Sequence, residues 1–129
     1  MTTLSPLGPI DEAIEEVRGQ FADYELQLNR DTEGAVVIIE NVYVGDQYEP
    51  NRTWLGFRIT SAYPYADVYP HYVGRVVRKD GAAHGQAVQP SEWQSREALQ
   101  LSRRSNGWNP NRDTAALKAV KVLSWFADQ

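Results

Sequence analysis

Residues 24–60 read YELQLNRDTEGAVVIIENVYVGDQYEPNRTWLGFRIT, and this stretch decides the fold. Tyr24, Leu26 and Leu28 alternate with polar residues, which is typical of a half-buried strand. Residues 31–34 predict a hairpin turn, and the β-branched run at 35–39, which 42–44 can extend, predicts a strand buried on both faces. After a polar loop at 45–52, residues 53–60 alternate again. The stretch therefore predicts an antiparallel meander of three strands.

Helical patterns precede and follow the meander. Pro9 suits the first turn of a helix, and the apolar residues from there recur on one helical face: Ile10, Ile14, Val17 and Phe21. Near the C terminus, Asp113 is the predicted N-cap of a last helix. The apolar face of that helix is predicted to contain Leu117, Val120, Leu123, Phe126 and Ala127. Residues 1–8 are expected to form a short flexible lead.

The remaining residues connect the meander to the last helix. Residues 61–70, SAYPYADVYP, predict an extended, ordered loop, because a residue before proline disfavours helix. Residues 71–78 predict a fourth strand. Residues 79–111 hold no long periodic run, although a short helix at 92–101 fits, and such long connections are often functional. The whole chain thus predicts a single α+β domain over 1–129, with helices on one face of an antiparallel sheet.

Composition excludes several classes of function. The 129 residues include no cysteine, which rules out disulfides, thiolate metal sites and thiol nucleophiles. A net charge of −4 argues against nucleic acid as the partner. No apolar run approaches the roughly 20 residues that span a bilayer. We therefore expect a cytoplasmic protein that needs no cofactor, has no membrane partner and binds no metal, since His71 and His84 lack a second ligand at metal spacing.

Two motifs carry a family resemblance. The strand at 53–60 is followed by Tyr63-Pro64 and then Pro70, which resembles the tyrosine-proline turn after the third strand of E2 and RWD domains. Residues 101–113, LSRRSNGWNPNRD, resemble a signature of the bacterial E2-like group called prokaryotic E2 family E. That group has a Ser-Arg pair, a Trp-x-Pro step and an Asp that opens the last helix. The resemblance covers roughly residues 24–126. Leu101 and Arg104 replace the aromatic residue and histidine usual around the Ser-Arg step.

The resemblance implies a UBC-like fold and a bacterial pathway that contains an E1-like (ThiF-type) enzyme and a ubiquitin-like modifier. An E2 enzyme transfers its modifier through a thioester, which needs a thiolate, and this sequence has no cysteine. The resemblance therefore implies that the chain binds these partners without catalysing transfer. One alternative is a conjugating enzyme whose cysteine has been replaced, for example at Ala83, Ser91, Ser95 or Ser102. Another is an RWD-type interaction domain unrelated to ubiquitin. The oligomeric state is left open.

The candidate partner-binding residues are Trp93, Tyr63, Tyr65, Ser102, Arg103 and Arg104. Trp93 stands among polar residues, so it is either an exposed contact or the anchor of its own loop. Ser102 with its two arginines could act as a nucleophile or contact an anion, but pairing of the arginines with Glu97 or Asp113 is the favoured interpretation. The expected structural residues are Pro64, Pro70, Trp108, Pro110 and Asp113, with Trp108 seating the last helix on the core.

Overall fold

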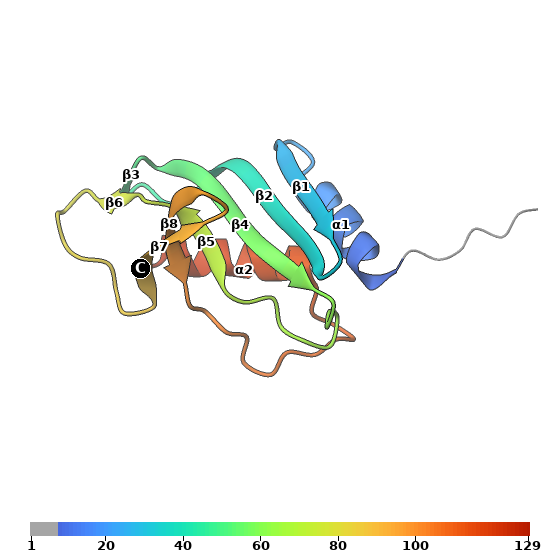
Figure 1. The fold of residues 1–129 in the computed structure, drawn as a ribbon. Helices are drawn as coiled ribbons and strands as arrows, with labels where there is room; N and C mark the ends of the chain where they lie inside the picture. The colour runs from blue at the N-terminus through green and yellow to red at the C-terminus, as the bar shows by residue number, and fades with distance from the viewer. Residues whose placement is uncertain (1–7) are drawn as a thin grey trace, which may run out of the picture.

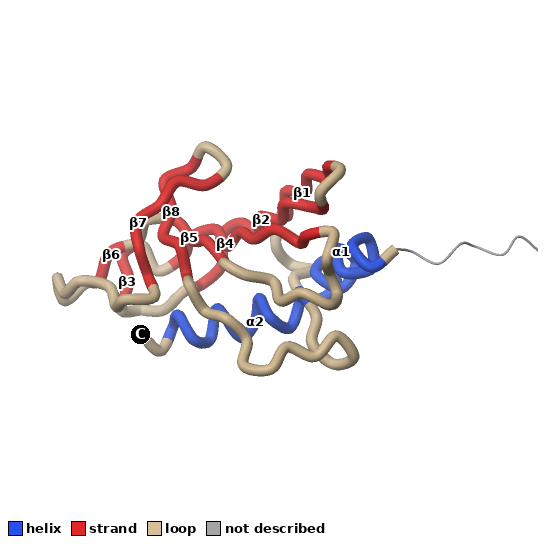
Figure 2. The backbone as a smooth tube through the Cα atoms, turned by 60° about the horizontal axis from the view of Figure 1, so that its bottom comes forward, coloured by secondary structure: helices blue, strands red, loops and turns tan. Residues whose placement is uncertain are grey.

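The computed structural model describes residues 8–129 and shows an α+β domain (Figure 1). An N-terminal helix α1, Pro9–Gln20, is followed by the strands and then by a C-terminal helix α2, Ala115–Ala127. Both helices lie on one side of the main sheet (Figure 2). This arrangement confirms the predicted α+β class. Of the predicted lead at residues 1–8, only Gly8 falls within the described residues, where it precedes α1 in an extended conformation.

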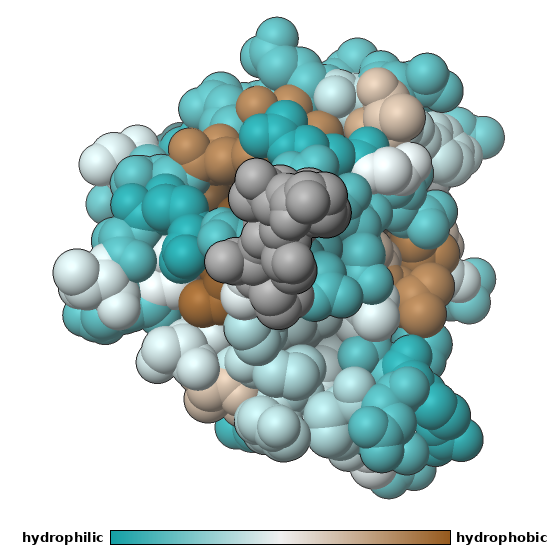
Figure 3. All heavy atoms as spheres, turned by 90° about the vertical axis from the view of Figure 1, so that its right-hand side faces the viewer, coloured by the Kyte–Doolittle hydropathy of each residue, from teal (hydrophilic) through white to brown (hydrophobic). Residues whose placement is uncertain are grey.

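Helix α1 forms where its sequence predicts it. Pro9 occupies the first turn, and Asp11 and Glu12 lie at the positive end of the helix dipole. The buried residues of α1 are Ala13, Ile14 and Val17. The end of the molecule that carries α1 is mainly hydrophilic, with small, separate hydrophobic patches (Figure 3). The helix thus buries one stripe and leaves its other face in water.

The main sheet has six antiparallel strands in the order β1-β2-β4-β5-β8-β7. Strands β1, Leu26–Asp31, β2, Gly34–Tyr43, and β4, Arg52–Thr60, form the predicted meander. Strand β2 is buried on both faces from its start to Ile39, as its β-branched run predicts. In β4 the buried residues are Leu55, Gly56, Phe57 and Ile59, and the three apolar side chains face the helices.

Two predictions about short segments are wrong. The loop at 45–52 contains a two-residue strand β3, Tyr48–Glu49, and Tyr48 is fully buried. Its ring stacks on Phe126 at 4.4 Å, and its hydroxyl donates to the Phe126 carbonyl over 2.8 Å. The strand predicted at 71–78 is divided into β5, His71–Gly74, and β6, Val77–Arg78, because β6 leaves the main sheet to pair with β3.

A β-hairpin replaces the helix predicted at 92–101 and much of the expected long loop. Strands β7, Val88–Trp93, and β8, Arg96–Leu101, pair in register, and β8 also pairs with β5. The connecting residues Gln94 and Ser95 have φ of 54° and 61°. Two successive left-handed residues are typical of a type I′ turn, for which Asn-Gly is the favoured sequence. Gln94-Ser95 is not a typical sequence for such a turn, so the hairpin could not be predicted from the turn residues.

This turn yields a stability prediction. Replacing Gln94→Asn together with Ser95→Gly should raise the free energy of unfolding by about 1 kcal/mol, because left-handed φ is costly for residues with a Cβ. Urea titration of both proteins checks it. The same Asn-Gly pair at Gln86-Ala87, a turn without positive φ, is the control and should give no gain. Equal or lower stability of the hairpin variant would contradict the prediction.

Helix α2 differs from its prediction in cap and in face. Its N-cap is Thr114, whose hydroxyl accepts from the Leu117 N–H over 3.1 Å, so Asp113 is not the cap. Leu117 and Val120 are 46% and 39% exposed, although both were predicted on the apolar face. The buried residues are instead Ala115, Ala116, Lys118, Ala119, Val122 and Phe126. The alanine-rich face of α2 therefore packs against the sheet, and this face also includes one buried charged residue, Lys118.

Candidate partner-binding groove

The tyrosine-proline loop and the segment before α2 lie against each other. The Trp108 indole N–H donates to the Pro64 carbonyl over 2.7 Å, and the Tyr63 hydroxyl accepts from the Ala115 N–H over 3.1 Å. Tyr63 is buried, and Trp108 is partly buried against the core. Trp108 thus links the tyrosine-proline loop to the segment before α2. Burial raises the pKa of Tyr63, so this hydroxyl stays neutral and fixes the start of α2.

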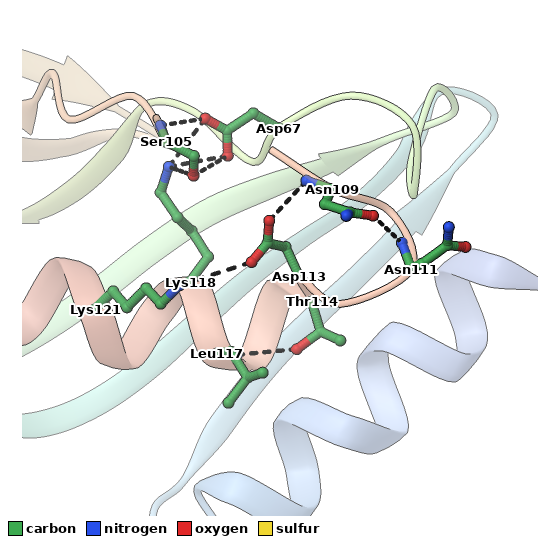
Figure 4. Close-up of polar contacts among 9 residues, drawn as sticks. All are labelled: Asp67, Ser105, Asn109, Asn111, Asp113, Thr114, Leu117, Lys118 and Lys121. Atoms are coloured by element: carbon green, nitrogen blue, oxygen red, sulfur yellow. Dashed lines mark hydrogen bonds and ion pairs between the residues drawn. The ribbon is translucent and has the colours of Figure 1, made fainter. Parts of the chain in front are cut away.

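A buried charged network joins the same two segments to α2 (Figure 4). Lys118, 4% exposed, places its Nζ 2.9 and 3.0 Å from the carboxylate oxygens of Asp67 and 2.7 Å from the Ser105 hydroxyl. Asp67 also accepts from the Ser105 backbone N–H over 2.7 Å and from its hydroxyl over 3.0 Å. Every polar atom of the network therefore has a partner, as buried charges require.

Burial and the neighbouring charges have opposite effects on the pKa values of Lys118 and Asp67. Burial lowers the pKa of Lys118, and Asp67 only partly offsets that effect. Burial raises the pKa of Asp67, but the Ser105 N–H and Lys118 outweigh it, so the pKa of Asp67 lies below its ordinary value. The Lys118 Nζ donates to Asp67 and to the Ser105 hydroxyl, and that hydroxyl donates to Asp67. In this arrangement Lys118 is an ion-pair partner of Asp67 and not a general base for Ser105.

Asp113 organises the turn before α2. Its carboxylate accepts from the Asn109 N–H over 2.7 Å and lies 3.6 Å from the Lys121 Nζ (Figure 4). The Asn109 side chain accepts from the Asn111 N–H over 2.9 Å and so closes the turn that contains the exposed Pro110. Asp113 thus holds the turn and does not cap the helix, contrary to its predicted role as N-cap.

Arg103 and Arg104 are exposed and contact aromatic rings. The guanidinium of Arg103 lies 6.0 Å from the Trp125 ring centroid, and that of Arg104 lies 4.1 Å from the Tyr69 ring centroid. Their predicted pairing with Glu97 or Asp113 is wrong, because Glu97 pairs with Arg75 and Asp113 with Lys121. Cation–π contacts orient a guanidinium and leave most of its N–H donors available.

Arg103 and Arg104 line a groove of about 680 Å³ between the 103–113 segment and α2. The helix contributes Leu117, Lys118, Lys121, Val122 and Trp125, which recur along one side of it. The segment contributes three arginines, at 103, 104 and 112, together with Asp113. Basic side chains therefore dominate the groove, although the chain as a whole is acidic.

The arginines of the groove stand out from the others in the chain. Six of the ten arginines have a carboxylate partner: Arg18, Arg30, Arg58, Arg75, Arg78 and Arg96. Within residues 8–129, Arg103, Arg104, Arg112 and Arg52 have none within 4 Å. Of these, only Arg52 lies outside the groove, and it donates to the Asn41 carbonyl over 3.0 Å. The unpaired positive charge is therefore concentrated in one place.

Trp93 lies outside this groove. It occupies β7 on the sheet face turned away from the helices, stacked on Tyr72 at 4.6 Å and beside Trp54 at 6.0 Å. A Cβ added at Gly56 would lie 2.2 Å from the indole, so the glycine makes room for it. Trp93 is thus covered by aromatic neighbours that its local sequence does not reveal. Tyr65, in contrast, is 81% exposed on the tyrosine-proline loop.

The described residues offer little for nucleophilic or metal chemistry. The Ser102 hydroxyl accepts from Gln100 over 3.3 Å, and the Ser105 hydroxyl belongs to the charged network. Between residues 8 and 129, no cluster of three or more His, Cys, Asp or Glu could hold a metal ion. His84 is hydrogen-bonded to the Val76 carbonyl at 2.9 Å. His71 is fully buried in β5.

Sequence reasoning missed five residues of this site: Asp67, Ser105, Arg112, Lys118 and Lys121. Lys118 did leave a signal, because it stands between Ala115 and Val122 on the side of α2 that faces the core. A lysine on a buried stripe implies a carboxylate partner. The sequence could not name that partner, because Asp67 lies 51 residues away.

Within residues 8–129, no helix is long and apolar enough to cross a membrane. No family model matches the chain, and no curated protein or solved structure matches it. The motifs, the charged groove and the chemistry that its residues permit are therefore the evidence that bears on function.

Proposed function

We propose that this chain is a non-catalytic E2-like protein of a bacterial ubiquitin-like modification system, with a UBC-like fold. It binds a ubiquitin-like modifier, an E1-like enzyme or both. Support comes from the order of helix, meander, tyrosine-proline loop and last helix, together with the LSRRSNGWNPNRD motif at 101–113. The β7–β8 hairpin departs from the expected plan, in which this stretch is a long loop.

One observation carries the binding role. The segment with the family resemblance packs on the tyrosine-proline loop and presents Arg103, Arg104 and Arg112 to solvent without carboxylate partners. Exposed arginines near aromatic side chains are enriched where proteins bind one another. The two serines of this segment are occupied by internal hydrogen bonds, and the sequence holds no cysteine. The segment is therefore suited to contact and not to transfer.

The test is an assay for covalent loading. Incubated with a matched E1-like enzyme, modifier and ATP, the chain should form no adduct sensitive to thiols or hydroxylamine on a non-reducing gel, because residues 8–129 present no activated nucleophile. A cysteine-bearing conjugating enzyme is the positive control. The chain should nevertheless co-purify with the modifier or the E1-like enzyme. A labile adduct would overturn the non-catalytic role, and failure to bind either protein would overturn the proposed function.

A further inference from the structure

We infer that the groove between the 103–113 segment and α2 binds an acidic peptide segment of a partner protein. The balance of charge within the groove points to this ligand. Asp67 neutralises Lys118, and Asp113 neutralises Lys121. The three arginines at 103, 104 and 112 remain, each exposed and without a carboxylate among residues 8–129. A ligand with carboxylates would supply the missing partners, and a guanidinium fork matches a carboxylate in two parallel hydrogen bonds.

The arginines are held in place before any ligand arrives. Ser105, which follows Arg104 directly, is fixed by its hydrogen bonds to Asp67 and Lys118. Arg103 and Arg104 also rest near the rings of Trp125 and Tyr69. A segment fixed in this way loses less conformational entropy when it binds, so more of the contact energy appears as affinity.

The size of the groove suits an extended peptide. On the helix side it runs from Leu117 to Trp125, which is about 12 Å along the axis. An extended chain covers that length with about four residues. Leu117 and the partly buried Trp125 give the groove an apolar part, where a hydrophobic side chain of the peptide can pack between its acidic neighbours. The ligand therefore combines carboxylates with at least one apolar residue.

The surroundings of the groove favour a peptide over nucleic acid. Asp113 lines the groove, and the whole chain carries 17 acidic against 13 basic residues. The three arginines form a short patch, whereas nucleic-acid binding needs a long basic stripe. A short acidic peptide meets only the groove. The inference rests on the proposed function only in taking the partner to be a protein.

The experiment measures binding of a fluorescein-labelled peptide of about eight residues, rich in Glu with one central Leu. Arg103→Gln, Arg104→Gln and Arg112→Gln are made separately and together, and thermal unfolding confirms that each variant is folded. Each single change should weaken binding about tenfold, the usual effect of losing a charge-assisted hydrogen bond. Arg52→Gln is the matched control, because Arg52 also lacks a carboxylate partner but lies outside the groove.

Three further comparisons decide the outcome. Binding should weaken as the ionic strength is raised to about 0.5 M, and a peptide with Gln in place of Glu should not bind. No peptide binding, or equal affinity of the triple variant and the unmodified chain, would overturn the inference. Tighter binding of single-stranded oligothymidylate than of the peptide would assign the groove to nucleic acid. Retained peptide binding with no binding of the modifier or E1-like enzyme would refute the proposed function alone.

Discussion

Replacing Lys118 by methionine is expected to lower the free energy of unfolding by about 3–5 kcal/mol. The substitution shortens the side chain by only one atom but leaves the partly buried carboxylate of Asp67 without its cation. Asp67 would then retain only its hydrogen bonds from Ser105. Breaking a buried ion pair costs more than the pair itself contributes, because the remaining charge cannot be solvated. Denaturant titration near pH 7 measures the loss.

Lys121 provides a matched control for Lys118. It lies less than one helical turn further along α2, its side chain is 70% exposed, and its Nζ is 3.6 Å from Asp113. Lys121→Met should therefore cost less than about 1 kcal/mol, as exposed ion pairs do. The double change Lys118→Met with Asp67→Asn should recover much of the loss, since no charge is left buried. Equal stability of the Lys118 and Lys121 variants would show that the network contributes nothing.

Local periodicity was sufficient to predict the strands whose apolar side chains alternate and the helix whose apolar side chains recur on one face. Helix α1, the strands β1, β2 and β4, and the position of α2 all follow from such patterns. The orientation of α2 does not, because its sequence AALKAVKVLSWFA is apolar on most sides. The larger apolar residues predicted that the face with Leu117 and Val120 is buried, but the face rich in alanine packs against the sheet. Which face is buried depends on packing against the sheet, and local sequence does not describe that packing.

The hairpin was hidden for a different reason. Residues 92–101, EWQSREALQL, are mainly good helix formers, so local propensity favours the wrong structure. Pairing of β8 with β5 supplies the missing stabilisation, and that pairing joins residues such as Leu99 and Val73. Tertiary contacts override propensity in such cases. The aromatic cover of Trp93 was missed together with the hairpin, since Tyr72 and Trp54 belong to other strands.

The candidate groove was predicted in part. The motif at 101–113 located Arg103 and Arg104, and the structure places both beside α2. The residues that hold them, Asp67 and Lys118, are brought together only by the fold. Trp93 was predicted among the same partner-binding residues, but it packs with Trp54 and Tyr72 on the sheet face turned away from α2. A short motif can thus identify the groove, whereas the charge balance within it needs the structure.

The stability of the chain is expected to fall by about 3 kcal/mol between pH 7 and pH 4 because of His71. Burial and, to a smaller extent, the charge of Lys118 outweigh the opposite effect of Asp67 and lower the pKa of His71 to about 3. In the unfolded chain the histidine has a pKa near 6.5. Between these two pKa values, His71 is therefore protonated in the unfolded state and neutral in the folded state. The loss begins as the pH falls through about 6.5 and ends near the folded pKa of about 3.

His71→Leu tests this origin by unfolding in denaturant at a series of pH values. The leucine variant should show a nearly flat stability between pH 7 and pH 4.5, because it has no group there whose burial forbids protonation. His84→Leu is the matched control for the change of a histidine to leucine, since His84 is only partly buried. The lowered pKa of Asp67 makes stability fall as the pH drops through its ordinary value of 3.8, so most of that effect lies below this window. A His71→Leu variant that keeps the full slope would show that other groups cause the acid sensitivity.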